Sequence, residues 1–411
     1  MGVIASSGRR LLRAPSFIGL LATNFVLGLT SAFIAPFGSL WATQEIGMSQ
    51  RFLGVFMTVN SLSAIVVTSL LARWSDSHVT RRTLLCAGAC AGALGNIGYA
   101  FVREPLLLLA IGSSALAVAS LSFAQLFAHV REELGRPENE GADVPFAMGV
   151  LRACYALAWM IGPNLGAWIK GRFGYRGLFL ATTTFFLVLL CFVFCFVARR
   201  TPIAAARPRE RGLAAWGLRQ PRLLLHCAAF GLMFAAFTLN GLNLPLFLTQ
   251  TLGGSEKNVG AAFAISPLFE MLFMVAFGHL AARGHQRSVI LLGASASVCY
   301  FIALGFVTAP WQVYPLQVLN AAAVAVTVSV AIPFVQDLLP GQTGVATSLF
   351  SNSLKVGSLL GFATFGALAV GLGNAGLFPV CAGLAAATAG IIALARPPRV
   401  TARSVPKIAP E

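Results

Sequence analysis

Long apolar runs alternate with short polar segments along almost the whole chain. An α-helix needs about 20 apolar residues to cross roughly 30 Å of hydrocarbon. Twelve runs reach that length, and most charged residues lie between them. The pattern predicts an all-α membrane protein with transmembrane helices near residues 16–41, 51–72, 83–102, 105–127, 146–169, 175–198, 222–248, 257–281, 288–308, 311–336, 343–370 and 375–395.

The composition agrees with this class. Hydrophobic residues make up 57% of the 411 residues and charged residues 10%, whereas a soluble domain carries roughly 25% charged residues. The eight cysteines and five histidines lie in apolar stretches and near helix ends, without the spacing of a metal site or a disulfide framework. We therefore expect a lipid bilayer around the protein and neither a metal nor a cofactor.

The basic residues are distributed unevenly between the two sides of the membrane. Of the 29 Lys and Arg, 21 fall on the side that would hold both termini, and Arg152 and Lys355 fall inside spans. Since cytoplasmic loops carry an excess of Lys and Arg, we expect both termini in the cytoplasm. This distribution accounts for the net charge of +16 without a nucleic-acid partner. The basic residues on the other side are Arg51, Arg103, Lys170, Arg172, Arg176 and Lys257.

The two halves of the chain resemble each other. One shift of 206 residues, without a gap, superposes the loops after spans 1 and 2 on those after spans 7 and 8. A single shift that serves both loops indicates a duplication. We expect six-helix halves at 1–198 and 222–396, a cytoplasmic linker at 199–221 and a cytoplasmic tail at 397–411. The superposed residues are Thr43, Gln44, Gly47, Ser49, Gly54 and Arg81 on Thr249, Gln250, Gly253, Ser255, Gly260 and Arg287.

The loop after span 2 has a distinctive charge pattern. It reads ARWSDSHVTRR and contains Asp76, Arg81 and Arg82. It resembles the loop signature Gly-x-x-x-Asp-Arg-x-Gly-Arg-Arg of the major facilitator superfamily. The resemblance implies twelve helices in two pseudo-symmetric halves that rock about a substrate bound near the midplane. A carboxylate and two guanidiniums at a helix end suit a latch of ion pairs. Positive-inside anchoring explains the arginines equally well, but it does not explain Asp76.

Span 5 carries a polar stripe in an otherwise apolar helix. Arg152, Ala156 and Trp159 lie on one face, next to a stripe of small residues that suits close packing on another helix. Pro163 removes a backbone hydrogen bond and permits a kink. The segment resembles the superfamily's antiporter motif, which implies export, through Gly149, Gly162, Pro163 and Gly166.

Two charges of opposite sign lie inside spans. An unpaired guanidinium in hydrocarbon costs about 2.5–3.5 kcal/mol on insertion scales, so Arg152 needs a partner or a water-filled cavity. Of the 13 carboxylates only Glu270 lies in the middle of a span, where it is either protonated or paired. We expect Glu270 and Arg152 to couple protons to transport. The alternative is an acid kept neutral by helix contacts.

Longer stretches narrow the resemblance to one family. LRACYALAWMIGP in span 5, NLPLFLTQTL and SPLFEMLF in spans 7 and 8, and FVQDLLPGQTGVATSLFSNSLKVG in spans 10 and 11 are similar to the sugar efflux transporters of bacteria. The similarity extends from roughly Pro36 to Arg396. It implies proton-driven export of small sugars and glycosides across the inner (plasma) membrane of a bacterium.

Span 5 also contains the residue types that a sugar site needs. Neighbouring hydroxyls require bidentate polar partners, and the C–H side of the ring requires an aromatic face. Arg152 and Trp159, two turns apart, supply both, and they resemble the Arg and Trp on the sugar-binding helix 5 of lactose permease. Amides in other spans are candidates to complete the site, although each is also suited to bridge two helices. These amides are Asn24, Asn60, Asn240, Asn243, Gln317, Asn320 and Asn352.

The sequence therefore predicts a monomeric exporter that exchanges sugars or glycosides for protons by alternating access. A multidrug/proton antiporter of the same superfamily is the alternative, favoured by the antiporter motif and by 32 phenylalanines. A non-transporting membrane sugar sensor is an alternative of another class. An enzyme is not expected, because the chain has neither Gly-x-Ser-x-Gly nor His-Glu-x-x-His.

Overall fold

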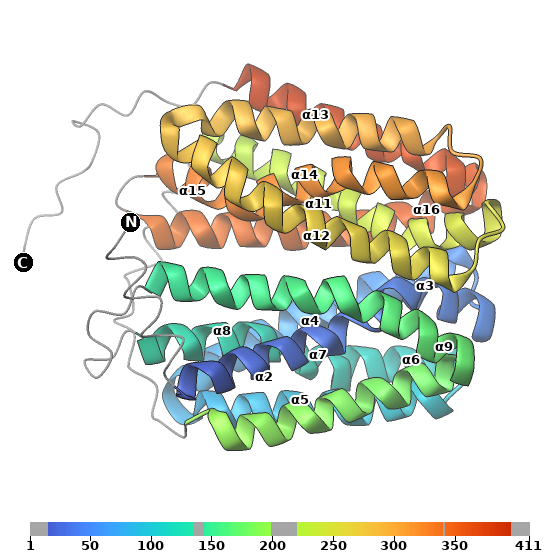
Figure 1. The fold of residues 1–411 in the computed structure, drawn as a ribbon, viewed down its shortest axis with the longest axis vertical. Coiled ribbons are helices and arrows are strands. Elements are labelled where there is room, and N and C mark those ends of the chain that lie inside the picture. Colours follow the sequence, from blue (N-terminus) through green and yellow to red (C-terminus); the bar gives the residue numbers. More distant parts are fainter. Residues whose placement is uncertain (1–14, 135–143, 199–219, 340–341, 396–411) are drawn as a thin grey trace, which may run out of the picture. The chain divides into compact units, whose positions relative to one another are not determined.

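The computed structural model describes residues 15–134, 144–198, 220–339 and 342–395. Every regular element in these ranges is helical (Figure 1), which confirms the all-α prediction. The chain divides into two compact units, residues 1–206 with 248–268 and residues 207–247 with 269–411. The predicted linker lies outside the described residues up to residue 219, and the predicted tail lies wholly outside them. The boundaries of the two halves stay a prediction.

Nine helical stretches in the described ranges are long and apolar enough to cross a membrane. Three of them have 51, 49 and 52 residues. A straight helix of that many residues, at about 1.5 Å per residue, would be roughly 75 Å long, more than twice the hydrocarbon thickness. Each also contains one glycine with positive φ, where the chain turns back, so each accommodates two of the twelve predicted spans. The glycines are Gly174 at 66°, Gly284 at 89° and Gly373 at 66°.

The first unit is a bundle of helices around its own apolar core. Leu85, Leu126, Leu151 and Leu189 are fully buried in that core. The fourth predicted span continues to Leu134 instead of ending near residue 127. The elements are α2 (Pro15–Ala32), η1 (Ala35–Phe37), α3 (Gly38–Leu40), η2 (Trp41–Glu45), α4 (Gln50–His78), α5 (Arg81–Phe101), α6 (Pro105–Ile111), η3 (Gly112–Leu116), α7 (Ala117–Ala119), α8 (Leu121–Leu134), α9 (Val144–Phe196) and the first part of α12 (Glu256–Leu280).

The second unit is also a bundle of long helices, and it has an apolar core of its own. Phe334 and Phe350 each pack edge to face against Phe230 in it. Its elements, apart from the rest of α12, are α11 (Pro221–Leu246), η6 (Ala281–His285), α13 (Gln286–Leu304), η7 (Pro310–Gln312), α14 (Val313–Ser329), α15 (Ala331–Asp337) and α16 (Thr343–Leu394). The turn η5 (Phe247–Thr251) joins α11 to the segment of the first unit that begins at Leu248.

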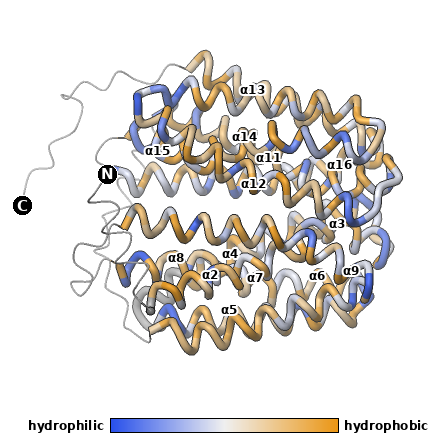
Figure 2. Tube along the Cα trace, in the orientation of Figure 1, coloured by the Kyte–Doolittle hydropathy of each residue, from blue (hydrophilic) through white to orange (hydrophobic). Residues whose placement is uncertain are grey.

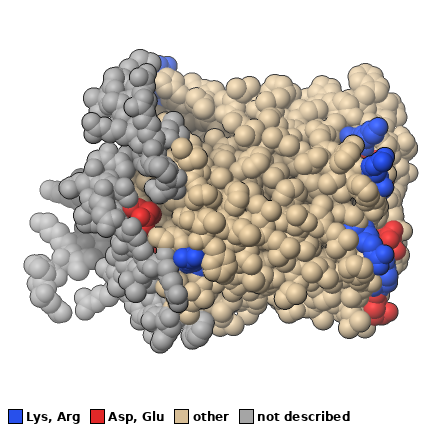
Figure 3. Space-filling view, turned by 60° about the horizontal axis from the view of Figure 1, so that its bottom comes forward, with Lys and Arg blue, Asp and Glu red and all other residues tan. Residues whose placement is uncertain are grey.

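Polar residues gather at the ends of the helices. Figure 2 shows helical segments that are mostly hydrophobic along their length and hydrophilic near their connections. On the face in Figure 3, the Lys, Arg, Asp and Glu side chains lie toward the two ends of the helices, with a broad uncharged band between them. This distribution is that of a multi-pass membrane protein, whose apolar side chains contact lipid.

Small residues bring one pair of helices very close in each unit. In the first unit, a Cβ on Gly28 would lie 2.6 Å from Ala158 Cβ, and one on Gly162 would lie 2.6 Å from Ala32 Cβ. Gly166 likewise faces the carbonyl of Phe33. The Gly162–Gly166 part of the predicted packing motif therefore lies against α2. By contrast, no neighbouring atom lies within 4 Å of a Cβ placed on Gly149.

The second unit repeats this contact between α11 and the first half of α16. A Cβ on Gly357 would lie 2.2 Å from the carbonyl oxygen of Gly231, and one on Gly361 would lie 2.6 Å from that of Ala235. Helices in lipid associate through such close packing, because hydrocarbon outside the bundle is as apolar as the side chains inside it.

The local structure of the two halves repeats, but the shift changes along the chain. At a shift of 206, the π-turns η2 and η5 coincide, and Gly47 and Gly253 follow them with φ of 76° and 65°. In the following loops the shift is 205, because a bond between Arg81 and Glu132 in the first half corresponds to one between Gln286 and Asp337 in the second.

The arginines of these loops show the same change of register. Arg82 donates to the carbonyl of Phe194, and Arg287 donates to the carbonyls of Ile392 and Ala393, near the end of each half. The counterpart of Arg287 is therefore Arg82, and the predicted superposition of Arg81 on Arg287 is wrong by one residue. The stretch from Gly253 to Gln286 is therefore one residue shorter than the stretch from Gly47 to Arg81.

The contact between α11 and α16 predicts a test of packing. Gly357→Ala should lower the free energy of unfolding by about 1–3 kcal/mol, because its methyl group would overlap the backbone of Gly231. Thermal melting in detergent, followed by size exclusion, measures the change. Gly383→Ala in the same helix is the control, since nothing lies within 4 Å of its Cβ position. Equal melting temperatures for the two variants would contradict the close contact.

Candidate functional site

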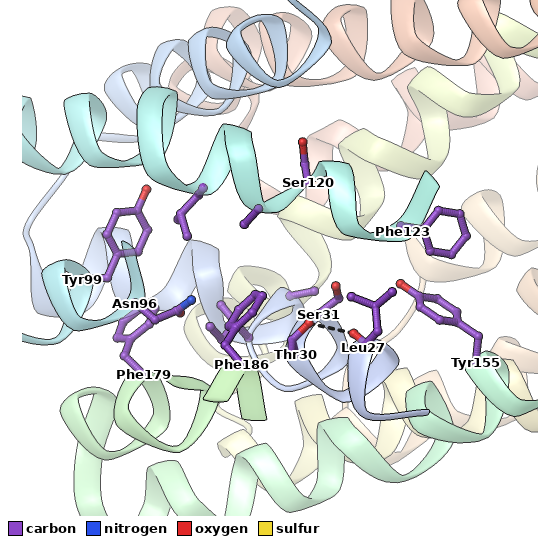
Figure 4. Close-up of a pocket in the computed structure, with 14 residues that line it drawn as sticks. Leu27, Thr30, Ser31, Asn96, Tyr99, Ser120, Phe123, Tyr155, Phe179 and Phe186 are labelled. Carbon is purple, nitrogen blue, oxygen red and sulfur yellow. Dashed lines mark hydrogen bonds between the residues drawn. The ribbon is translucent and has the colours of Figure 1, made fainter. Parts of the chain in front are cut away.

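A cavity of about 430 Å³ lies within the first unit (Figure 4). Its walls come from α2, α5, α8, α9 and the η3–α7 segment. Its volume is within the range of about 300–1,000 Å³ that is typical of small-molecule sites. The lining residues are Leu27, Thr30, Ser31, Ile34, Ala35, Asn96, Tyr99, Leu116, Ala119, Ser120, Phe123, Tyr155, Phe179 and Phe186.

Aromatic side chains form much of the wall. Tyr155 of α9 and Phe123 of α8 pack edge to face, with ring centroids 5.0 Å apart. In Figure 4 the Tyr155 hydroxyl points toward the other lining residues. Tyr99 of α5 stacks on Trp41 and makes an edge contact with Phe179. These contacts hold the rings in place before any ligand binds, and ring faces and edges suit the C–H surface of a ligand.

Hydroxyls and one amide supply the polar atoms of the lining. Thr30 and Ser120 donate to carbonyls of their own helices at 2.7 and 2.6 Å, so each oxygen keeps capacity to accept. Asn96 Nδ2 donates to the carbonyl of Gly92 at 2.7 Å, whereas Asn96 Oδ1 has no partner among the described residues. Leaving such an oxygen unsatisfied costs about 1–3 kcal/mol. None of the residues that line the described cavity is charged, so the cavity suits a neutral ligand.

Asn60, one of the predicted substrate amides, lies behind the lining. A Cβ on Gly112 would lie 2.4 Å from the Tyr99 hydroxyl and 2.5 Å from Asn60 Oδ1. Both side chains therefore close over the bare backbone of η3, where only glycine leaves them room. In this structure Asn60 supports the wall through Tyr99.

Arg152 and Trp159 lie on α9 but are not among the lining residues. Arg152 is exposed and has no hydrogen bond or ion pair within the described part of the chain. The indole nitrogen of Trp159 is buried and without a described partner. Tyr155 lies three residues after Arg152 and four before Trp159, so the three share one helix face.

The sequence interpretation missed Tyr155 because it drew the stripe through Ala156. Asn96, a mid-span amide like those selected, was also missed.

Glu270 lies on α12 in the part that belongs to the second unit. Its side chain is half-buried and has no hydrogen bond or ion pair with any described residue. Pro267, which interrupts the backbone hydrogen bonds of α12, lies three residues before it. A carboxyl group without a partner remains available for proton exchange. Arg152 belongs to the other unit, and its pairing with Glu270 stays a prediction.

Three of the predicted amides meet at one buried tyrosine of the second unit. Asn240 and Gln317 donate to the hydroxyl oxygen of Tyr300 at 3.3 and 3.1 Å. Asn320 in turn donates to Gln317 Oε1 at 3.2 Å. Tyr300 is fully buried. The network therefore ties α11, α13 and α14 together.

The other predicted amides occupy different environments. Asn24 Nδ2 donates to the carbonyl of Leu151 at 2.7 Å, and Asn243 Nδ2 donates to the carbonyl of Asn374 at 2.8 Å. Both contacts bridge helices, the alternative that the sequence left open. Asn352 is exposed. A role for these amides in binding stays a prediction.

The two arginines of the charged loop hold helices within the first unit. Arg81 forms a salt bridge with Glu132 of α8 at 2.8 Å. Arg82 donates to the carbonyl of Phe194 at 2.8 Å and lies over the ring of that residue. The side chain of Asp76 lies outside the described residues. These contacts are those of anchors, and a latch formed by Asp76, Arg81 and Arg82 stays a prediction.

A partly buried ion pair joins α9 to the start of α12 within the first unit. Lys170 and Glu256 form a salt bridge, with side chains only 15% and 31% exposed. Lys170 also lies 4.8 Å above the ring of Tyr175. One turn further along α12, a Cβ on Gly260 would lie 2.9 Å from the carbonyl oxygen of Pro163. The pair therefore stabilises a contact in which two helix backbones nearly touch.

Comparisons with known proteins agree on one superfamily. The model of the Major Facilitator Superfamily matches residues 20–242 and 225–411. A Deinococcus radiodurans protein named for sugar efflux is 32% identical over 92% of this chain and 97% of its own length. Sugar efflux transporter A of Escherichia coli K12 is 30% identical over 89% of this chain and 92% of its own length. The crystal structure of a D323A mutant of the nucleoside transporter NupG is 14% identical in sequence. It matches over 92% of this chain and 99% of the NupG chain with a TM-score of 0.79, which shows the fold.

The ion pair between α9 and α12 predicts the effect of reversing its charges. Lys170→Glu or Glu256→Lys alone should lower the free energy of unfolding by about 1–3 kcal/mol, because two like charges would face each other in a partly buried site. The double reversal should recover at least half of that loss in a thermal melt. Glu45→Lys is the control, since Glu45 and Arg103 form an exposed pair worth at most about 1 kcal/mol. A double variant that melts no higher than either single variant would contradict the pairing.

Proposed function

Since this chain belongs to the sugar efflux transporter family of the major facilitator superfamily, we propose that it exports small neutral sugars or glycosides in exchange for protons by alternating access. It is a transporter and not an enzyme. The cavity of the first unit is the substrate site in this proposal. Alternating access then exposes that site to the two sides of the membrane in turn.

The chemistry of the cavity lining supports a sugar as the substrate. Its walls combine aromatic rings with hydroxyls and an amide and include no charged residue. A sugar ring places its C–H face on an aromatic ring and its hydroxyls on polar groups. A lipophilic cation in the same cavity would lack a counter-charge, and a buried charge without a partner is strongly disfavoured. The lining therefore favours a sugar exporter over a multidrug/proton antiporter.

We assign the binding roles to one face of α9 and the helix beside it. Tyr155 and Phe123 provide the aromatic pair at the cavity wall. Arg152 and Trp159 share the Tyr155 face of α9. Neither lines the cavity in this conformation, so in this proposal they meet the sugar in another conformation of the transport cycle. There the Arg152 guanidinium binds neighbouring sugar hydroxyls, and Trp159 offers a second ring together with an indole N–H that lacks an acceptor among the described residues.

Glu270 is our candidate for the proton-coupling group. It is half-buried in an apolar helix and has no described partner, so loss of its proton would leave a charge in an unfavourable environment. A conformation that exposes the carboxyl group to water favours the charged form, and one that closes over it favours the neutral form. Protonation and conformation are therefore linked.

The orientation in the membrane follows from the distribution of charge. We propose that both termini lie in the cytoplasm of a bacterial cell and that the protein lies in the inner membrane. The excess of Lys and Arg on that side supports this orientation. Arg81 and Arg82 would then lie at the cytoplasmic ends of their helices.

The aromatic pair predicts a loss of sugar binding. Tyr155→Ala should weaken the affinity for a neutral glycoside about tenfold, because it removes a ring from the cavity wall. Tyr155→Phe should lose less, since it keeps the ring. A thermal-shift panel of glucose, lactose, an alkyl thioglycoside and a lipophilic cation measures binding, with the exposed Phe306→Ala as the control. Stabilisation by the cation alone would favour the multidrug alternative, and binding of sugar without counterflow in proteoliposomes would favour a sensor.

The role of Glu270 predicts a separation of exchange from coupling. Glu270→Gln should keep sugar counterflow, which needs no net proton movement, but lose uphill export driven by a pH gradient. Both are measured in proteoliposomes with labelled sugar. Glu104→Gln, at an exposed site in a connection between helices, is the control. Uphill export by the Glu270 variant at the normal rate would disprove the coupling role.

A further inference from the structure

Helix α5 is held tightly at the level of the cavity. A Cβ on Gly92 would lie 2.3 Å from Phe186 Cε1, and one on Gly95 would lie 2.6 Å from Leu116 Cδ2. Two glycines therefore let side chains of the neighbouring helices reach the backbone of α5 on either side. A helix packed in this way cannot rotate without a clash, so the position of Asn96, the next residue, is set by the scaffold.

Asn96 is a buried amide in the lining of the cavity, and its side-chain oxygen is itself shielded from solvent in this conformation. Its residue surface is only 2% exposed, and it belongs to the lining. Nδ2 is occupied by the carbonyl of Gly92, whereas Oδ1 has no partner among the described residues. Figure 4 shows Asn96 beside Phe179 and Phe186, one turn from Tyr99. The oxygen is thus a buried acceptor without a partner among the described residues.

Asn24 is a buried amide that bridges two helices in this molecule. It too is buried, its Nδ2 donates to a carbonyl at 2.7 Å, and its Oδ1 is unpartnered within the described chain. However, that carbonyl belongs to another helix, at Leu151, and Asn24 does not line the cavity. Asn96 bonds only to its own helix, so no helix contact accounts for its amide.

We propose that Asn96 is a specificity-determining residue whose Oδ1 accepts a hydrogen bond from one hydroxyl of the bound sugar. The inference rests on the proposed function. To present the oxygen to the cavity, the amide turns about its Cβ–Cγ bond, a torsion with a broad range, and exchanges its hydrogen bond to the Gly92 carbonyl for one from the sugar. Because a carbonyl oxygen can only accept, the ligand must carry a donor at that position. A deoxy or O-methyl sugar cannot supply that donor, whereas the free hydroxyl can.

The experiment compares the affinities of one glycoside and its monodeoxy analogues. Methyl β-glucoside and its 2-, 3-, 4- and 6-deoxy forms are titrated calorimetrically into the full-length protein in detergent. For the unmodified protein, one deoxy form should bind about tenfold more weakly than the parent, the effect of losing one hydrogen bond to a buried acceptor. In Asn96→Leu the ratio of the dissociation constant of that deoxy form to that of the parent should fall to about one. The same ratios for the other deoxy forms should stay unchanged.

Two further variants keep the test decisive. Asn96→Ala removes the same amide without adding bulk and should give the same ratio if Asn96→Leu does not fold. Thr388→Val is the control, because Thr388 bonds to the carbonyl of Ala229 in the second unit and does not line the cavity, and it should leave every ratio unchanged. A tenfold ratio that persists in both Asn96 variants, or that Thr388→Val also abolishes, would overturn the inference while leaving the sugar site intact. Absence of binding of the parent glycoside to the unmodified protein would overturn both the inference and the proposed function.

Discussion

The rest of the structure depends on the close approach of two helices in each unit. Lipid offers no hydrophobic gain for helix association, so helices join only where their backbones can come near enough for dense packing. Gly28 and Gly162 allow this between α2 and α9, and Gly357 allows it between α11 and α16. In the first unit the crossing places Thr30 and Ser31 of α2 and Tyr155 of α9 on the wall of one cavity. Larger residues at the crossing would separate the helices and alter that wall.

Polar groups in such a bundle are either satisfied by neighbours or left open, and an open group that lines a cavity is a candidate for ligand binding. Thr388 donates to the carbonyl of Ala229 on another helix, and Tyr300 accepts from two amides. These groups are consumed by the fold. Arg152, Glu270 and Asn96 Oδ1 are among the groups without described partners, and of these three only Asn96 lines the cavity. An open polar group in an apolar bundle costs stability. Its presence is accounted for by a ligand, a proton or water that satisfies it during transport.

The duplicated halves use one plan with different chemistry. The π-turns, the helix crossings and the loop contacts recur in both. In the second unit, however, the amide nitrogens of Asn240 and Gln317 donate to a fully buried tyrosine, whereas in the first unit the amide of Asn96 lines a cavity and its Oδ1 has no partner among the described residues. The first unit thus supplies the binding surface in our proposal, and the second contributes Glu270.

The sequence by itself determined the class, the spans and the family. Crossing a membrane depends on the length and polarity of a local segment, so most span limits were predicted to within about three residues. The small-residue stripe at Ala158, Gly162 and Gly166 also indicated a close contact with another helix. Only the tertiary structure decided which helix met that stripe and that Tyr155, not Ala156, lines the cavity. It also decided that Asn240 and Gln317 donate to Tyr300, whereas Asn96 lines the cavity. It also showed the one-residue change of register that pairs Arg82 with Arg287. The physical reason is that periodicity identifies the face of a helix, whereas the partner of that face comes from a distant part of the chain and is chosen by packing in three dimensions.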